Sequence, residues 1–103
     1  MKILITSTGN SVDSVFDLRF GRAEWYCIYD VENASTEFFN NESKNQQEGA
    51  GIKAAEQAAV FSVEKVISGD FGPKAKDLLN KFSIQMVVLQ EQGITIKEII
   101  NKL

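Results

Sequence analysis

Three short segments of this 103-residue chain combine glycine with groups that can bind an anion. In the first, Arg19–Ala23, two arginines flank a Phe-Gly pair; the other two are Gly49-x-Gly51 and Gly69-x-x-Gly72. A guanidinium group presents a rigid fork of N–H donors that matches carboxylates, phosphates and polyanionic cofactors. Glycines at a helix start expose backbone N–H groups at the positive end of the helix dipole. The sequence therefore predicts a binding site made of Arg19, Phe20, Gly21, Arg22, Gly49, Gly51, Gly69 and Gly72.

A purely structural explanation exists for each segment and stays open at this point. Glycines are common in the tight turns of α/β folds. Surface arginines often pair with neighbouring acids, here Asp17 or Glu24. Because three such segments occur in one small chain, we weigh ligand binding and turn formation equally.

The side chains that most enzymes use for catalysis are scarce. The chain has no histidine, which excludes histidine-based acid–base catalysis and removes the commonest transition-metal ligand. The single cysteine, Cys27, lies among aromatic residues, where a buried packing role is favoured over metal ligation. Asp70-Phe71-Gly72 matches the magnesium-binding tripeptide of kinases, but no other kinase motif accompanies it. We therefore expect no catalytic residue, no tightly held metal and no enzymatic activity; hydrolysis that depends on Asp70 ranks third among the alternatives.

The composition indicates one globular domain spanning residues 1–103. Hydrophobic residues make up 44% of the chain, enough for one core without disulfides, and a lone cysteine fits a reducing cytoplasm. The net charge of -3 and isoelectric point near 4.9 argue against nucleic acid or an anionic membrane as a partner. The first apolar run is too short for a signal peptide or a membrane span, so we expect a cytoplasmic protein.

Hydrophobic periodicity and turn residues predict eight elements. We expect strands at residues 2–5, 24–31, 35–40, 65–68 and 84–89, and helices at 50–61, 73–81 and from Thr95 to the C-terminus. Pro73 favours a first helical turn, and Thr95 with Glu98 forms a capping-box signature. Segment 12–20 is predicted to be mostly ordered loop, and the polar segment 40–48 to be a mobile loop.

The order of these elements predicts an α/β fold in three layers. The short connection at residues 32–34 makes the second and third strands an antiparallel hairpin, whereas the later alternation of helix and strand requires parallel crossovers. We therefore expect a mixed five-stranded sheet with helices on both faces. Ligands of such sheets bind beyond the carboxyl ends of the parallel strands, where the glycine segments are expected to lie.

The three segments, in this order, resemble the dinitrogenase iron–molybdenum cofactor biosynthesis family, which includes the NifX-like carriers and the C-terminal part of NifB. The resemblance covers essentially the whole chain, and its motifs are Phe20-Gly21-Arg22-Ala23 before an aromatic strand, Gly49-Ala50-Gly51-Ile52, and Gly69-x-x-Gly72-Pro73-Lys74-Ala75. It implies a ribonuclease-H-like topology and a role connected with nitrogen fixation. It also implies non-catalytic binding of an iron–molybdenum or iron–sulfur cofactor or precursor, with a cofactor-assembly protein as a partner.

Members of that family often carry a histidine ahead of the Gly-x-Gly or beside the Phe-x-Arg-Ala loop, where this chain has Gln47-Glu48 and Arg19. The leading hypothesis is therefore a carrier in which Arg19 and Arg22 contact an anionic ligand, with carboxylates or the cofactor's own ligands holding any metal. The alternative is a regulatory or accessory protein-interaction domain with a small-anion pocket and no metal cluster.

Overall fold

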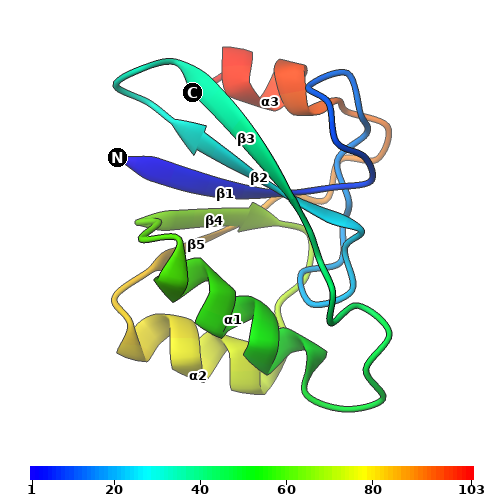
Figure 1. The fold of residues 1–103 in the computed structure, drawn as a ribbon, viewed down its shortest axis with the longest axis vertical. Coiled ribbons are helices and arrows are strands. Elements are labelled where there is room, and N and C mark those ends of the chain that lie inside the picture. Colours follow the sequence, from blue (N-terminus) through cyan, green and yellow to red (C-terminus); the bar gives the residue numbers. More distant parts are fainter.

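The computed structural model describes residues 1–103 as one mixed sheet with helices on both faces (Figure 1). Its elements, in chain order, are β1 (Lys2–Ser7), β2 (Trp25–Asp30), β3 (Ser35–Asn40), α1 (Ala50–Val60), β4 (Lys65–Ser68), α2 (Pro73–Lys81), β5 (Gln85–Val88) and α3 (Ile96–Asn101). The strand order is β3-β2-β1-β4-β5; β2 runs antiparallel to β1 and β3, and the other neighbours are parallel. The predicted three-layer α/β fold and its mixed five-stranded sheet are confirmed.

Strand β1 occupies the centre of the sheet because it is apolar on both faces. Every residue from Ile3 to Ser7 is buried. Leu4 packs on the side of α1 and α2, whereas Ile3 and Ile5 pack on the side of α3. A continuous buried run is typical of a strand that is covered on both sides.

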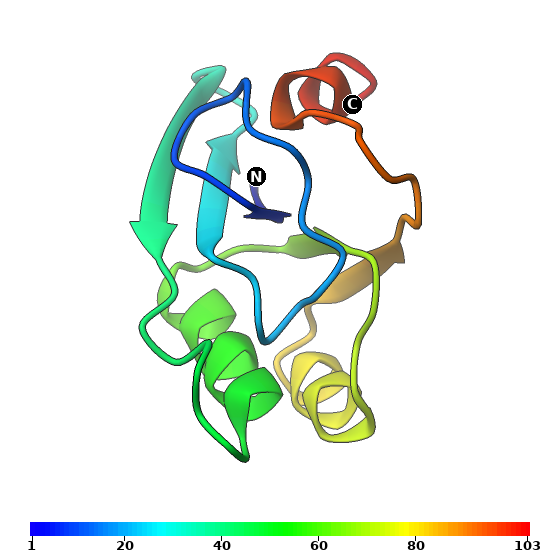
Figure 2. The same cartoon turned by 90° about the vertical axis from the view of Figure 1, so that its right-hand side faces the viewer.

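Helices α1 and α2 cover one face of the sheet, as Figure 2 shows. Three alanines of α1, Ala54, Ala55 and Ala58, are completely buried against this face. Their small side chains let the helix backbone lie close to the strands. Together with Leu79 of α2, they pack over Leu4 and other residues of the central strands. These alanines therefore position α1, and with it the glycines at its start.

The opposite face is covered by α3 and by the long loop between β1 and β2. Phe16 from the loop and Ile96 and Ile99 from α3 are buried there. Cys27 is also completely buried on this side, which agrees with its predicted packing role, whereas Tyr26 packs against the α1–α2 side. No helix is long and apolar enough to cross a membrane.

Several element boundaries differ from the predicted ones by one or two residues: β1 runs two residues further, β2 is one residue shorter at each end, and α1 ends one residue earlier. β5 is one residue shorter at each end, and α3 stops at Asn101 because Lys102 already caps it. The segment predicted to be a mobile loop begins differently: Asn40 completes β3, and Asn41 is buried with 2% exposure. The polar segment 40–48 therefore contains a buried residue, Asn41, whose hydrogen bonds are described below.

Candidate anion-binding site

Loops from three parts of the chain meet beyond the edge of the sheet where β1, β3 and β4 end (Figure 2). They enclose a pocket of about 320 Å³. Its lining consists of Arg19, Phe20, Gly21, Arg22, Gln47, Glu48, Gly49, Ala50, Gly51, Asp70 and Gly72. Seven of the eight residues predicted from the sequence thus share one pocket, drawn from segments that are far apart in the chain. We call it the edge pocket.

Gly69 is the predicted residue that does not line the edge pocket. A side chain at this position would begin 2.7 Å from the carbonyl oxygen of Leu18 and 2.8 Å from its Cα. Gly69 is therefore needed for the close packing of the β4–α2 connection against the long loop, and its predicted contact with a ligand has no support from this geometry.

Gly21 brings the arginine loop into direct contact with the start of α1. A Cβ atom at Gly21 would lie 2.6 Å from the backbone nitrogen of Gly51 and 2.9 Å from the carbonyl carbon of Ala50. No real Cβ tolerates such backbone contacts, so only glycine permits this approach. Phe20 fixes the same loop from the other side, because its ring is buried 5.0 Å from that of Phe71.

Helices α1 and α2 both begin with a glycine at the edge pocket. The N-cap residues are Gly49, which has a left-handed backbone (φ 79°), and Gly72, which is extended. Neither helix start has a side-chain cap or an acidic residue in its first turn. A second depression, of about 330 Å³, lies between the two helix starts and shares Gly49, Gly51 and Gly72 with the edge pocket. Two positive helix-dipole ends therefore face one region of the surface.

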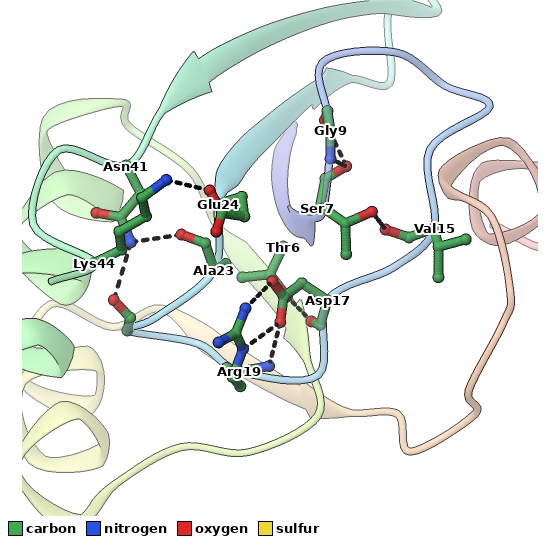
Figure 3. A network of polar contacts seen from close by, with 12 residues as sticks. Thr6, Ser7, Gly9, Val15, Asp17, Arg19, Ala23, Glu24, Asn41 and Lys44 are labelled. Carbon is green, nitrogen blue, oxygen red and sulfur yellow. Dashed lines mark hydrogen bonds and ion pairs between the residues drawn. The ribbon is translucent and has the colours of Figure 1, made fainter.

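Arg19 is held by a buried carboxylate. Its Nε and Nη2 atoms donate to the two oxygens of Asp17 at 3.0 Å each, and Asp17 is only 4% exposed (Figure 3). The hydrogen bonds from Arg19 to Asp17 raise the pKa of this guanidinium above its ordinary value. The side chain is still 59% exposed, and Nη1 has no partner within the protein. Arg19 is thus oriented by Asp17 and keeps one donor group for a ligand.

Arg22 is used differently, because its guanidinium binds the backbone of the β3–α1 loop. Nη1 donates to the carbonyl oxygens of Lys44, at 2.8 Å, and Gln46, and Nη2 donates to that of Gln47 at 3.3 Å. Arg22 was predicted to contact a ligand, but in this structure its guanidinium bonds to the protein backbone instead. Arg22 holds the loop that forms one wall of the edge pocket.

Asn41 anchors the walls of the edge pocket, a role that sequence reasoning missed. Its side-chain amide donates to the carbonyl oxygens of Gly21 and Ala23 at 2.9 Å each (Figure 3). Its Oδ1 accepts from the N–H of Ser43. Lys44 adds an ion pair with Glu24 to the same junction. These contacts join the arginine loop to the β3–α1 loop. The only sequence signal was an asparagine directly after a strand, a common position for residues that bond to their own backbone.

A buried hydroxyl pair lies beneath Asp17 at the ends of β1 and β4. Thr6 donates its hydroxyl to the carbonyl oxygen of Asp17 at 2.6 Å, and its Oγ1 lies 2.8 Å from the Oγ of Ser68. All three residues are buried. The backbone of Asp17, whose carboxylate orients Arg19, is thus bonded to the central strand of the sheet.

The residues present do not fit a metal cluster that is ligated by protein side chains. Cys27 is fully buried on the far side of β2, and burial raises its pKa to about 12, so it stays a neutral thiol. No group of three or more cysteine, aspartate and glutamate side chains is placed to hold a metal ion. Two carboxylates, Glu48 and Asp70, line the edge pocket, beside the two arginines and the helix starts. The donor set fits an anion that brings its own metal ligands.

The family model described as dinitrogenase iron-molybdenum cofactor matches residues 1–103. The chain belongs to this family. The match spans all three glycine segments, so the resemblance seen in the sequence is confirmed. No curated protein matches the chain.

Two solved structures show that the family fold is closely preserved. The apo form of the orange protein from Desulfovibrio gigas is 28% identical with a TM-score of 0.91; the alignment covers 98% of this chain and 84% of that one. A Thermotoga protein described as a candidate NifB protein of the DUF35 family is 29% identical with a TM-score of 0.82; coverage is 97% of this chain and 84% of that one. Both likenesses cover nearly the whole of this chain.

Proposed function

We propose that this protein is a non-catalytic carrier for an anionic iron–molybdenum or iron–sulfur cofactor, or a precursor of one, which it binds in the edge pocket. Membership of the dinitrogenase iron–molybdenum cofactor family supports the chemical class of the cargo. The cargo brings its own sulfide or other ligands, because the protein has no thiolate or imidazole placed to supply them. The site of action would be the cytoplasm, with a cofactor-assembly protein delivering or receiving the cargo.

The observation that carries this proposal is the pair of uncapped helix starts. The first intrahelical bonds run from Lys53 to Gly49 in α1 and from Lys76 to Gly72 in α2. The amides that precede them, at residues 50–52 and at 74 and 75, have no hydrogen-bond partner within the protein. Five free N–H donors at two positive dipole ends suit the sulfide or oxide face of an anionic complex.

The arginines add positive potential and shape to this donor set. Arg19 has a free Nη1 and is oriented by Asp17. Arg22 fixes the wall that carries Gln47 and Glu48, so we expect its substitution to loosen the pocket. Because such a ligand is bound by hydrogen bonds and charge instead of covalent metal bonds, it can be released intact, as a carrier requires.

The sharpest test adds a side-chain cap to the start of α2, which has none. Gly72 is extended, and a Cβ there would meet no atom within 4 Å, so Gly72→Asp fits without strain. The new carboxylate would accept the free amides of α2 and repel an anion. We expect a gain in stability of a few tenths of a kcal/mol over glycine, together with at least about tenfold weaker ligand binding. Gly72→Ala is the matched control, because it adds the same Cβ without a cap.

The measurement is anaerobic incubation of each purified variant with an iron–sulfur cluster assembled in solution, followed by gel filtration. Cluster absorbance and metal retained per chain are compared, and thermal unfolding confirms that both variants fold. The carrier proposal predicts that wild type and Gly72→Ala retain cluster and that Gly72→Asp does not. Equal retention by all three variants, or none by wild type, would refute it.

A further inference from the structure

The outer edge of β5 is an uncharged strand with nothing paired to it. β5 is the last strand in the sheet order, and residues 82–90 contain neither a charged residue nor a proline. Val88 is 59% exposed and Phe82 is 41% exposed. An apolar depression of about 190 Å³ continues this surface between β5 and α3, where Val87 and Leu89 are part of its lining. Figure 2 shows β5 at the end of the sheet, with α2 below it and α3 above.

The opposite edge of the sheet is protected in the usual way. β3 carries an exposed glutamate, Glu37, at its middle, and its Phe39 packs on Phe61 at a centroid distance of 4.6 Å. Native proteins place charges, prolines or bulges on edge strands because an open edge invites pairing with another strand. β5 is short, with four residues, but it carries no charge or proline, so its open edge fits a strand-pairing surface.

The backbone groups available on this edge follow from the inner pairing. The N–H groups of Gln85 and Leu89 donate towards β4, to Glu64 and Ser68. Because successive residues of a strand alternate in direction, the N–H and C=O groups of Met86 and Val88 point away from β4. Four backbone hydrogen-bonding groups are therefore free on the open edge of each molecule.

We infer that two copies of this protein associate through antiparallel pairing of their β5 strands around a twofold axis at Val87. Met86 of one subunit then lies opposite Val88 of the partner subunit, and the same pair recurs on the other side of the axis. The four groups on each edge form four backbone hydrogen bonds, and the three residues of each subunit nearest the axis, Met86, Val87 and Val88, are apolar.

Charge explains why the partner is a second copy. At a twofold axis each residue meets its own counterpart, so any charge near the axis would face a like charge. The uncharged run of residues 82–90 avoids this repulsion, whereas pairing through β3 would bring two copies of Glu37 together. The paired segment is short compared with a standard interface of about 800 Å² per partner, so we expect a dimer that dissociates on dilution.

Sedimentation velocity over a concentration range tests this inference, and it does not depend on ligand binding. From about 10 µM to about 1 mM, the range suited to a small interface, the wild-type mass should rise from the 11.5 kDa of one chain towards twice that value. Val88→Lys should keep the protein monomeric, because it places a lysine next to the axis. Val60→Lys is the matched control: this valine is 72% exposed on α1, away from β5.

A cross-linking arm tests the register. Residues directly opposite at a position without hydrogen bonds lie about 4.5 Å apart between Cα atoms, within disulfide range. Val87→Cys should therefore form a disulfide-linked dimer on mild oxidation, whereas Val60→Cys should not, and the buried Cys27 should take no part. A constant monomer mass up to about 1 mM, or equal effects of Val88→Lys and Val60→Lys, would overturn the proposal.

Discussion

The three helices of this protein begin in two different ways. α3 satisfies its own first turn: Thr95 accepts from the N–H of Glu98 at 3.2 Å, and Glu98 accepts from the N–H of Thr95 at 3.0 Å. α1 and α2 begin at Gly49 and Gly72 and have no such bonds. All three helices follow loops at the same edge of the sheet, so the difference lies in the capping residues and not in the fold.

The first turn of α3 is bonded within the protein and stabilises the fold, whereas the first turns of α1 and α2 have free N–H groups that can bind a ligand. A capping box typically stabilises a helix start by about 1 kcal/mol, and a glycine at the N-cap provides less of this stabilisation. The glycine-capped starts of α1 and α2 face the edge pocket, beside Arg19 and Arg22, whereas the capped start of α3 lies outside its lining. The uncapped amides are thus concentrated where family membership leads us to propose a cofactor.

The largest effect is expected from Gly21→Ala, which would push the arginine loop off the start of α1. The new Cβ would lie 2.6 Å from the backbone nitrogen of Gly51, and neither backbone can move without disturbing the other. We expect a loss of about 3 kcal/mol in the free energy of unfolding, measured by urea denaturation. Gly72→Ala is the control, because its Cβ meets no atom within 4 Å. Similar losses in the two variants would show that the close approach does not matter.

A smaller effect is expected at the capped start. Thr95→Ala removes the side chain that accepts from the amide of Glu98, and it should lower the free energy of unfolding by about 1 kcal/mol. Ligand retention should be unchanged, because Thr95 does not line the edge pocket. If Thr95→Ala weakened cluster retention as strongly as Gly72→Asp, the functional distinction between the two kinds of helix start would fail.

The smallest effect is a pH dependence of the same cap. The hydrogen bonds that Glu98 accepts from the backbone N–H and hydroxyl of Thr95 hold the pKa of Glu98 below its ordinary value of 4.5. A lowered pKa in the folded state means that the ionised form stabilises the fold above the ordinary pKa. That contribution is lost as the pH falls through the folded-state pKa.

Urea denaturation between about pH 6 and about pH 3 would measure this contribution. Glu98→Gln is the suitable comparison, since glutamine can still cap but does not titrate. We expect the stability of wild type relative to Glu98→Gln to fall on acidification. A constant difference across that range would mean that the carboxylate contributes nothing through its charge.

Local sequence patterns were sufficient for the elements and for part of the site. The apolar run of β1, the alanine stripe of α1, Pro73 at the start of α2 and the Thr95–Glu98 box each depend on neighbours a few residues away, and each is present. The glycines at 49 and 72 were also recognisable as helix starts. Their position at one pocket followed from the rule that loops after parallel strands share an edge.

Only the tertiary structure decided what the polar side chains of the site do. The guanidinium of Arg22 bonds to backbone that lies 22 to 25 residues further along the chain, and Asn41 reaches back 18 and 20 residues. Gly69 looked like a binding glycine, but it is needed where Leu18 packs against it. Long polar side chains can form hydrogen bonds of similar strength with many partners. Their actual partners are therefore set by which loops the folded sheet brings together. Glycine spacing and capping residues, by contrast, act within one turn and could be read directly from the sequence.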